Sequence, residues 1–73
     1  MVPLQPLQSS NIKAAGYDPA RQELFIEFVS GPTYRYDRVP EALWKGLLDA
    51  QSHGKFLREA VQLKGFAYQR IVG

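Results

Sequence analysis

Residues 22–29 read QELFIEFV, and this stretch decides the fold. Leu24, Ile26 and Phe28 alternate with residues 23, 25 and 27, two of which are glutamates. Successive side chains of a strand point to opposite faces, so this period of two is typical of a strand buried on one face. The residues that follow, SGPTYRYD (30–37), supply a turn and a second strand rich in tyrosine. Together the two segments predict a β-hairpin.

The loop of this hairpin decides which face carries the tyrosines of residues 34–36, because a one-residue slip moves every side chain to the other face. A two-residue loop at Ser30-Gly31 would place Glu27 beside Tyr34 and leave both tyrosines on the open face. A type I turn with its glycine in the left-handed conformation would place Ile26 beside Tyr34, and both tyrosines would face the core. The second solution is the commoner one, and Ser-Gly is a weak signal for the first. We favour the buried arrangement and keep the exposed one as the alternative.

The segments on either side of the hairpin complete the pattern. Residues 11–17 read as a short strand with Ile12, Ala14 and Gly16 on one side, and Asp18-Pro19 begins the turn that follows it. From residue 40 the apolar period changes to 3.6, which predicts a helix with a broad apolar face and an acidic and basic opposite face. A second helix is predicted from an N-cap at Ser52 to a terminating glycine at Gly65. Gly46, in the middle of the first helix, indicates close approach of another backbone.

Residues 66–72 alternate again and read as one more strand. The predicted fold class is α+β: a three-stranded antiparallel meander, a helical hairpin on one face, and a fourth C-terminal strand (βββααβ). Pro3 and Pro6 make residues 1–8 an extended, frayed N-terminal leader, and residues 9–73 form a single domain. The predicted core lies between sheet and helices and consists of Leu24, Ile26, Phe28, Leu43, Leu47, Phe56, Ala60 and Val61.

Composition limits what so short a chain can be. Its 73 residues suffice for one domain of marginal stability, so a partner or self-association could stabilise it. The N-terminus lacks the basic and apolar regions of a signal peptide, and nothing approaches the length of a membrane span. The chain has no cysteine, which excludes disulfides and thiolate metal sites and fits a reducing compartment. We expect a cytoplasmic protein with no membrane contact.

The residues that carry catalytic chemistry are sparse. His53 is the only histidine, and it stands between Ser52 and Gly54 at a predicted helix start, where an exposed structural residue is the expectation. The acidic residues are scattered, and no glycine-rich phosphate loop precedes Lys55. We therefore expect no catalytic residue, no metal site, no cofactor and no small-molecule substrate: the chain is not predicted to be an enzyme.

The open face of the sheet is the first candidate binding surface. In either register it is expected to keep Ala15, Tyr17, Phe25 and Val29, and an apolar patch on so small a domain usually meets a partner. We take Tyr17, Phe25 and Val29 as the candidate protein interface, for a homo-oligomer or another protein. An unpaired edge of the sheet is a second way to dock such a partner. A protein-interaction or self-associating module is therefore the first functional hypothesis.

The second hypothesis is weak, sequence-tolerant RNA binding by an accessory domain. The formal charge of the chain is only +2, but residues 55–73 carry four basic residues and one acidic residue. Aromatic side chains surrounded by lysine and arginine are how several modules stack single-stranded bases. The candidate nucleic-acid contacts are Arg35, Arg38, Lys55, Arg58, Tyr68 and Arg70.

An ordered set of short motifs resembles the KTSC domain, a family named for the C-terminal extension of some lysyl-tRNA synthetases. The motifs are Ser9-Ser10-Asn11-Ile12, Gly16-Tyr17-Asp18, Leu24-x-Ile26-x-Phe28, Gly31, Tyr34-x-Tyr36, Val39-Pro40 and Ser52-x-Gly54. The likeness runs from about Ser9 to Arg70. It implies the small α+β fold; no activity is established for the family, and RNA binding is suggested mainly by the synthetase context.

One departure from the family pattern concerns the start of the second helix. The family usually follows Ser-x-Gly with an aromatic residue, Phe and Asn, whereas this chain has Lys55-Phe56-Leu57. If that asparagine contacts a ligand in relatives, the chain lacks the contact. If it only caps or packs, the leucine enlarges the core.

Overall fold

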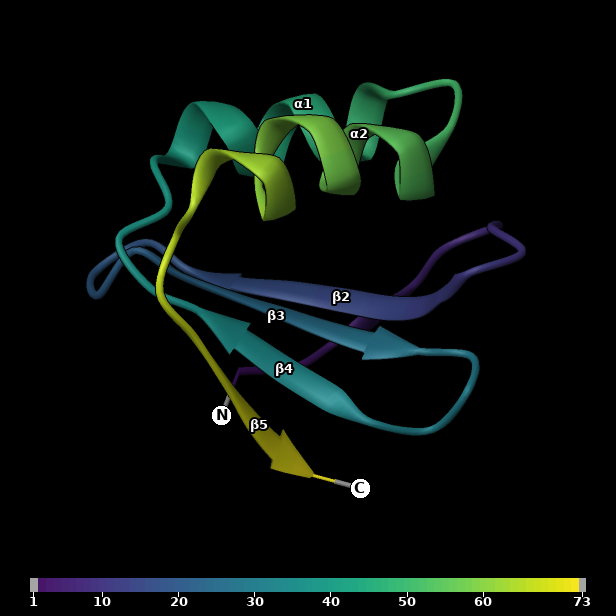
Figure 1. The fold of residues 1–73 in the computed structure, drawn as a ribbon, viewed down its shortest axis with the longest axis horizontal. Coiled ribbons are helices and arrows are strands. Elements are labelled where there is room, and N and C mark those ends of the chain that lie inside the picture. Colours follow the sequence, from purple (N-terminus) through teal and green to yellow (C-terminus); the bar gives the residue numbers. More distant parts are fainter. Residues whose placement is uncertain (1, 73) are drawn as a thin grey trace.

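The computed structural model describes residues 2–72, which form an antiparallel sheet with two helices on one face (Figure 1). The strands are β1 (Gln5–Pro6), β2 (Ile12–Asp18), β3 (Glu23–Phe28), β4 (Thr33–Tyr36) and β5 (Tyr68–Val72). The helices are α1 (Glu41–Asp49), α2 (His53–Ala60) and the 3-10 turn η1 (Gln62–Lys64). The sheet order is β1-β2-β3-β4-β5. The predicted α+β fold is confirmed; β5 pairs with β4, and β1 is an additional strand.

The register of the β3–β4 hairpin is the buried one. Ile26 pairs with Tyr34 and Leu24 with Tyr36, so the tyrosines share the helix-covered face with the apolar residues of β3. Gly31 has a φ of 123°, which the turn requires and which side chains other than hydrogen rarely allow. Its N–H donates to the carbonyl of Phe28 at 2.9 Å and closes the turn. Turn chemistry therefore predicts the register correctly.

The faces of β2 differ from the predicted ones because the strand contains a β-bulge. The register shifts between Ile12 and Ala14, after which Ala15 pairs with Ile26 and Tyr17 with Leu24. An extra residue in one strand reverses the faces of all residues beyond it. Ala15 and Tyr17 therefore face the helices, and the expectation that they lie on the open face is wrong.

The face opposite the helices is partly covered by the N-terminal leader, which runs across it in Figure 1. Gln5 pairs with Ala15, and the residues before it lie over Gly16, where an added Cβ would stand 2.6 Å from the Pro3 carbonyl oxygen and 2.8 Å from the Leu4 side chain. Phe25, the neighbour of Gly16 on β3, is only 5% exposed. The leader is thus extended, as expected, but it pairs with β2 and packs on the sheet.

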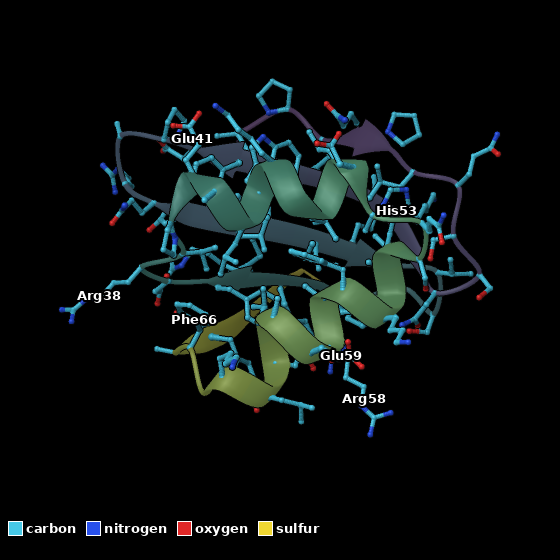
Figure 2. The ribbon with its side chains drawn as sticks, turned by 90° about the horizontal axis from the view of Figure 1, so that it is seen from above. Arg38, Glu41, His53, Arg58, Glu59 and Phe66 are labelled. Carbon is cyan, nitrogen blue, oxygen red and sulfur yellow. The ribbon has the colours of Figure 1, made fainter. Side chains whose placement is uncertain are left out.

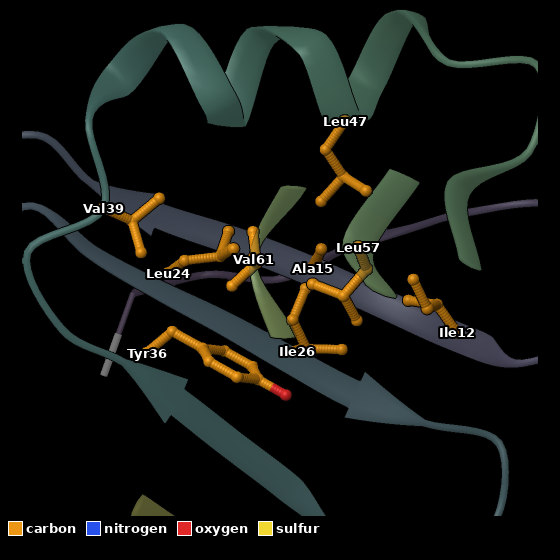
Figure 3. Packing of buried hydrophobic residues seen from close by; sticks show 9 residues of the cluster. All are labelled: Ile12, Ala15, Leu24, Ile26, Tyr36, Val39, Leu47, Leu57 and Val61. Atoms are coloured by element: carbon orange, nitrogen blue, oxygen red, sulfur yellow. The ribbon is translucent and has the colours of Figure 1, made fainter. Parts of the chain in front are cut away.

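The hydrophobic core lies between the sheet and the helices (Figure 3). Its buried members are Ile12, Ala15, Leu24, Ile26, Tyr36, Val39, Leu47, Leu57 and Val61. Four predicted core residues, Leu24, Ile26, Leu47 and Val61, are among them, and the other four, Phe28, Leu43, Phe56 and Ala60, pack around the cluster while partly exposed. The predicted core is therefore confirmed, with Ile12, Val39 and Leu57 added at its centre.

The helix signals are mostly confirmed. The Ser52 hydroxyl accepts a hydrogen bond from the Lys55 N–H at 3.2 Å and caps α2. Gly65, with a φ of 80°, ends η1 instead of α2, because the chain tightens into a 3-10 turn after Val61. Gly46 makes room for a side chain, not for a backbone: an added Cβ would lie 2.6 Å from Cζ of Phe56.

Candidate nucleic-acid interface

Three tyrosines gather at the β4–β5 side of the sheet, on the face that carries the helices. Pairing of Tyr36 with Tyr68, and of Tyr34 with Arg70, brings the side chains together. The rings of Tyr34 and Tyr68 are 5.8 Å apart between centroids and inclined by 15°, and those of Tyr36 and Tyr68 are 5.9 Å apart and inclined by 39°. We call Tyr34, Tyr36 and Tyr68 the tyrosine cluster.

Exposure differs among the three tyrosines and is highest for Tyr68, on the edge strand β5. Tyr36 is 3% exposed and belongs to the core, Tyr34 is half-buried with the Phe28 ring against it edge to face, and Tyr68 is 64% exposed. The rings of Tyr34 and Tyr36 therefore pack against the exposed ring of Tyr68. A ligand would meet the Tyr68 ring first, because β5 is the last strand of the sheet.

A pocket of about 230 Å³ opens beside the tyrosine cluster. Gln62 of η1 and Phe66, which precedes β5, complete its walls. The side-chain amide of Gln62 donates a hydrogen bond to the Tyr36 hydroxyl at 3.2 Å. Burial raises the pKa of Tyr36 above its ordinary value of 10.0, against the opposing effect of the Gln62 hydrogen bond. The hydroxyl is thus protonated at neutral pH and can donate. We call this site the aromatic pocket.

Two of the predicted basic residues lie near the aromatic pocket. Arg70 is the cross-strand partner of Tyr34 and shares its side of the sheet. Arg38, in the loop before α1, lines a shallow hollow together with Phe66, which also lines the pocket. Figure 2 shows Arg38 and Phe66 at the same end of the molecule.

Arg35 lies on the opposite face of the sheet and is already engaged. It pairs with Phe25 of β3, and its Nε donates to a carboxylate oxygen of Asp37 at 2.8 Å. A carboxylate oxygen of Glu23 lies 3.8 Å from the same nitrogen, and a second guanidinium nitrogen donates to the Gln69 side chain at 3.2 Å. These bonds fix Arg35 within the protein, on a different face from the tyrosine cluster.

Lys55 and Arg58 lie in a second hollow, which we call the serine pocket. It has a volume of about 560 Å³ and is lined by Ser9, Ser10, Asn11, Ser52, Gly54, Lys55, Arg58, Glu59 and Leu63. The Ser9 hydroxyl accepts hydrogen bonds from the N–H groups of Asn11 and Ile12, both at 3.2 Å. Gly54 packs against Asn11: a Cβ added at Gly54 would lie 3.4 Å from the Cβ of Asn11. Two motifs far apart in the sequence therefore meet here, but the six predicted basic and aromatic contacts do not form one surface.

The candidate protein interface is not assembled on the open face. Tyr17 faces the helices, where its ring stacks on Trp44 at 5.9 Å and 12°, and Phe25 is buried beneath the leader. Val29 is 57% exposed, but it lies in the hairpin turn without the other two. The predicted three-residue patch is therefore wrong, for the two physical reasons given above: the bulge in β2 and the leader.

His53, the only histidine of the chain, links the two helices. His53 is half-buried, not exposed, and its Nδ1–H donates to the carbonyl of Leu47 at 2.7 Å, which ties the start of α2 to the end of α1. Within residues 2–72, no three histidine or acidic side chains gather in a way that could hold a metal ion. The same part of the chain contains no helix long and apolar enough to cross a membrane.

The comparison with family models matches the KTSC domain over residues 8–66. The chain belongs to the KTSC domain family. A crystal structure of a KTSC domain protein from Yersinia pestis superimposes with a TM-score of 0.87 at 37% identity, covering 94% of this chain and 96% of that one. The fold and the sequence therefore agree on the family.

Relatives of this KTSC domain include small proteins and parts of larger ones. A protein of Tsukamurella paurometabola is 48% identical over 59 residues, which are 81% of this chain and 88% of that protein. An uncharacterized protein of Stutzerimonas stutzeri is 42% identical, covering 89% and 92%. A lysine–tRNA ligase of Nostoc is 35% identical over 69 residues, 94% of this chain but 12% of the ligase.

Three of the KTSC motifs contribute residues to the two pockets. The Tyr-x-Tyr of β4 supplies two members of the tyrosine cluster, and the Ser-Asn and Ser-x-Gly segments line the serine pocket. Leu57, where the resemblance expects asparagine, is 1% exposed and lies in the core, so here the position packs. Gln62 and Phe66 carry no motif, and only the three-dimensional arrangement brings them to the tyrosines.

Proposed function

We propose that this KTSC domain is a non-enzymatic module that binds single-stranded RNA in the cytoplasm, weakly and with little sequence preference. One observation carries the proposal: the exposed Tyr68 ring is supported by a nearly parallel Tyr34 ring, with Arg70 beside it on the same strand. Aromatic rings next to cationic side chains bind single strands by stacking on bases and pairing with phosphates. Every base has a flat face, so such a surface tolerates many sequences.

Two further observations support the proposal. The domain has a counterpart within a lysine–tRNA ligase, whose name gives a tRNA as its substrate. The cations near the tyrosines are few, Arg38 and Arg70 being those that sequence analysis identified, and so few charges support weak rather than tight binding. Two or three phosphate contacts to a single strand correspond to a slope of roughly −1.4 to −2 for the logarithm of affinity against the logarithm of salt concentration.

The test is a fluorescence anisotropy titration of a labelled single-stranded RNA of mixed sequence at several salt concentrations. Arg70→Ala is expected to weaken binding and flatten the salt slope by somewhat under one unit. Tyr68→Ala is expected to weaken binding at an unchanged slope, because stacking releases no counterions. Arg58→Ala is the matched control, since it removes the same charge from the serine pocket. No binding by the intact protein at low salt would refute the proposal. Equal losses of affinity for Arg70→Ala and Arg58→Ala would show that the RNA does not bind specifically beside the tyrosine cluster.

Self-association is the second candidate function, favoured by the position of β5 at the edge of the sheet. At the opposite edge, β1 consists of two residues, one of which is a proline that cannot donate to a ladder. β5 has five residues without proline, and a second copy could extend the sheet by pairing with it. Sedimentation velocity over a wide concentration range tests this candidate: Arg70→Pro should reduce the associated fraction, because the Arg70 N–H points away from β4 toward the free edge, and a monomer at all concentrations would exclude it.

A further inference from the structure

The aromatic pocket is too small for a ligand of drug size and suited to a single planar ring. Its volume is about 230 Å³, below the range of roughly 300–1,000 Å³ that is usual for small-molecule sites. Four of its five lining residues are aromatic: Tyr34, Tyr36, Phe66 and Tyr68. Rings of this kind attract either another flat ring by stacking or a cation by its charge.

Charge decides between these two kinds of ligand. None of the five lining residues is acidic, and Arg70 stands opposite Tyr34 on the neighbouring strand. A nearby guanidinium repels a cationic ligand and attracts an anion attached to the ring. A nucleotide combines these two features, since its base is flat and its phosphate is negative. The arrangement therefore favours a nucleotide over a methylated amine.

Gln62 supplies the polar group that a base edge needs. One N–H of its amide is used by the Tyr36 hydroxyl, while its carbonyl oxygen and second N–H make no hydrogen bond to residues 2–72. A carboxamide offers a donor and an acceptor side by side, and every base edge presents such a pair in one order or the other. Gln62 is therefore able to bind a base edge without strong selection among bases.

We propose that the aromatic pocket holds one unstacked nucleobase of a bound single strand, with Tyr68 against its face and Gln62 at its edge. This inference rests on the proposed RNA-binding function and adds to it the claim that a base, and not only the sugar–phosphate backbone, makes the contact. A domain with one such base site should bind short single strands and should not bind duplexes, whose bases are already paired.

The experiment compares two octamers of equal charge, one a single-stranded RNA and one a ribose–phosphate chain without bases. The RNA is expected to bind at least about fivefold more tightly, since one stacked base contributes that much or more. Gln62→Leu and Tyr68→Ala should each reduce this ratio, whereas Tyr68→Phe should preserve it. Leu63→Ala is the matched control, because Leu63 is also exposed on η1 but lines the serine pocket. In the NMR spectrum, the side-chain amide signals of Gln62 should shift when the RNA octamer is added and stay in place when the base-free octamer is added.

The possible results distinguish a failure of the base site from a failure of RNA binding itself. Equal affinity for the two octamers would overturn the base site and leave an RNA-binding surface that contacts only the backbone. A preference for RNA that survives Tyr68→Ala would place the base elsewhere and also overturn the inference. No binding of either octamer would overturn the proposed function together with the pocket.

Discussion

The hydroxyl of Tyr17 donates a hydrogen bond of 2.6 Å to the carbonyl oxygen of Val39. The bond joins β2 to the loop that leads into α1, and the Tyr17 ring stacks on Trp44 of that helix. A residue that sequence analysis places on the open face therefore fastens the helical layer to the sheet. The bulge in β2 is what turns its side chain to this side.

Tyr17→Phe removes this hydrogen bond and keeps the stacked ring. We expect the free energy of unfolding to fall by about 0.5–1.5 kcal/mol, the usual net contribution of one such bond. Urea denaturation followed by tryptophan fluorescence measures the change. Tyr68→Phe is the control, because that exposed hydroxyl forms no hydrogen bond within residues 2–72. An unchanged midpoint for Tyr17→Phe would show that the bond contributes nothing.

Two tyrosines make the fold sensitive to alkaline pH. Burial raises the pKa of Tyr17, assisted by the carboxylates of Glu41 and Asp18, and burial also raises that of Tyr36. The unfolded chain then loses these protons first, near pH 10, while the folded chain still holds them. The contribution of these two tyrosines to the free energy of unfolding is therefore fully present below about pH 10. It is lost as the pH rises through their folded-state pKa values. Tyr17→Phe should make this fall shallower, as denaturation midpoints between pH 8 and 11 would show.

Leu47→Ala tests the central packing of α1 against the sheet. Leu47 is 1% exposed, so its truncation leaves a cavity and should cost about 2–5 kcal/mol. Small domains have little stability to lose, and much of the protein should unfold at moderate temperature. Lys45→Ala, on the exposed side of the same helix, should change the melting temperature little. A melting temperature that Leu47→Ala barely alters would contradict the observed orientation of the helix.

Gly46→Ala tests the contact between the two helices. Alanine favours a helix over glycine by about 1 kcal/mol, but its methyl group would overlap the Phe56 ring, and overpacking costs about 1–3 kcal/mol. We expect net destabilisation in the wild-type background. Phe56→Leu replaces the ring by a smaller side chain. In that background Gly46→Ala should become neutral or stabilising. Additive effects in this double-mutant cycle, measured by denaturation, would contradict the contact.

Several parts of the fold follow from local chemistry and could be predicted. The hairpin register depends on one glycine with a positive φ, and the start of α2 depends on one serine hydroxyl. These signals lie within a few residues of the feature they control. The bulge in β2 has no such signal, because residues 12–15 contain neither glycine nor proline, and the faces of that strand are therefore predicted incorrectly beyond it.

The candidate site was harder to predict because it is assembled from distant segments. Tyr68 and Arg70 lie two residues apart on one strand, so their period of two correctly places them on one face. Gln62 reaches the tyrosines only because a 3-10 turn follows α2. The excess of basic residues after position 55 looks like one patch in the sequence, yet Arg58 and Arg70 lie in different surroundings. Charge counted along a chain does not locate it in space.

The N-terminal leader covers an apolar part of the sheet. Phe25 is 5% exposed because residues 2–4 lie across its side of the sheet, above Gly16. A chain that begins at Gln5 should expose the Phe25 ring and lose roughly 1.5–3 kcal/mol, the cost of uncovering one large apolar side chain. The uncovered face should then drive self-association, which sedimentation velocity would detect as a concentration-dependent rise in mass. In that background Phe25→Gln should restore the monomer, whereas in the chain of residues 1–73 it should mainly destabilise, because a buried amide lacks partners. A shortened chain with unchanged stability would show that the leader does not cover this face in solution.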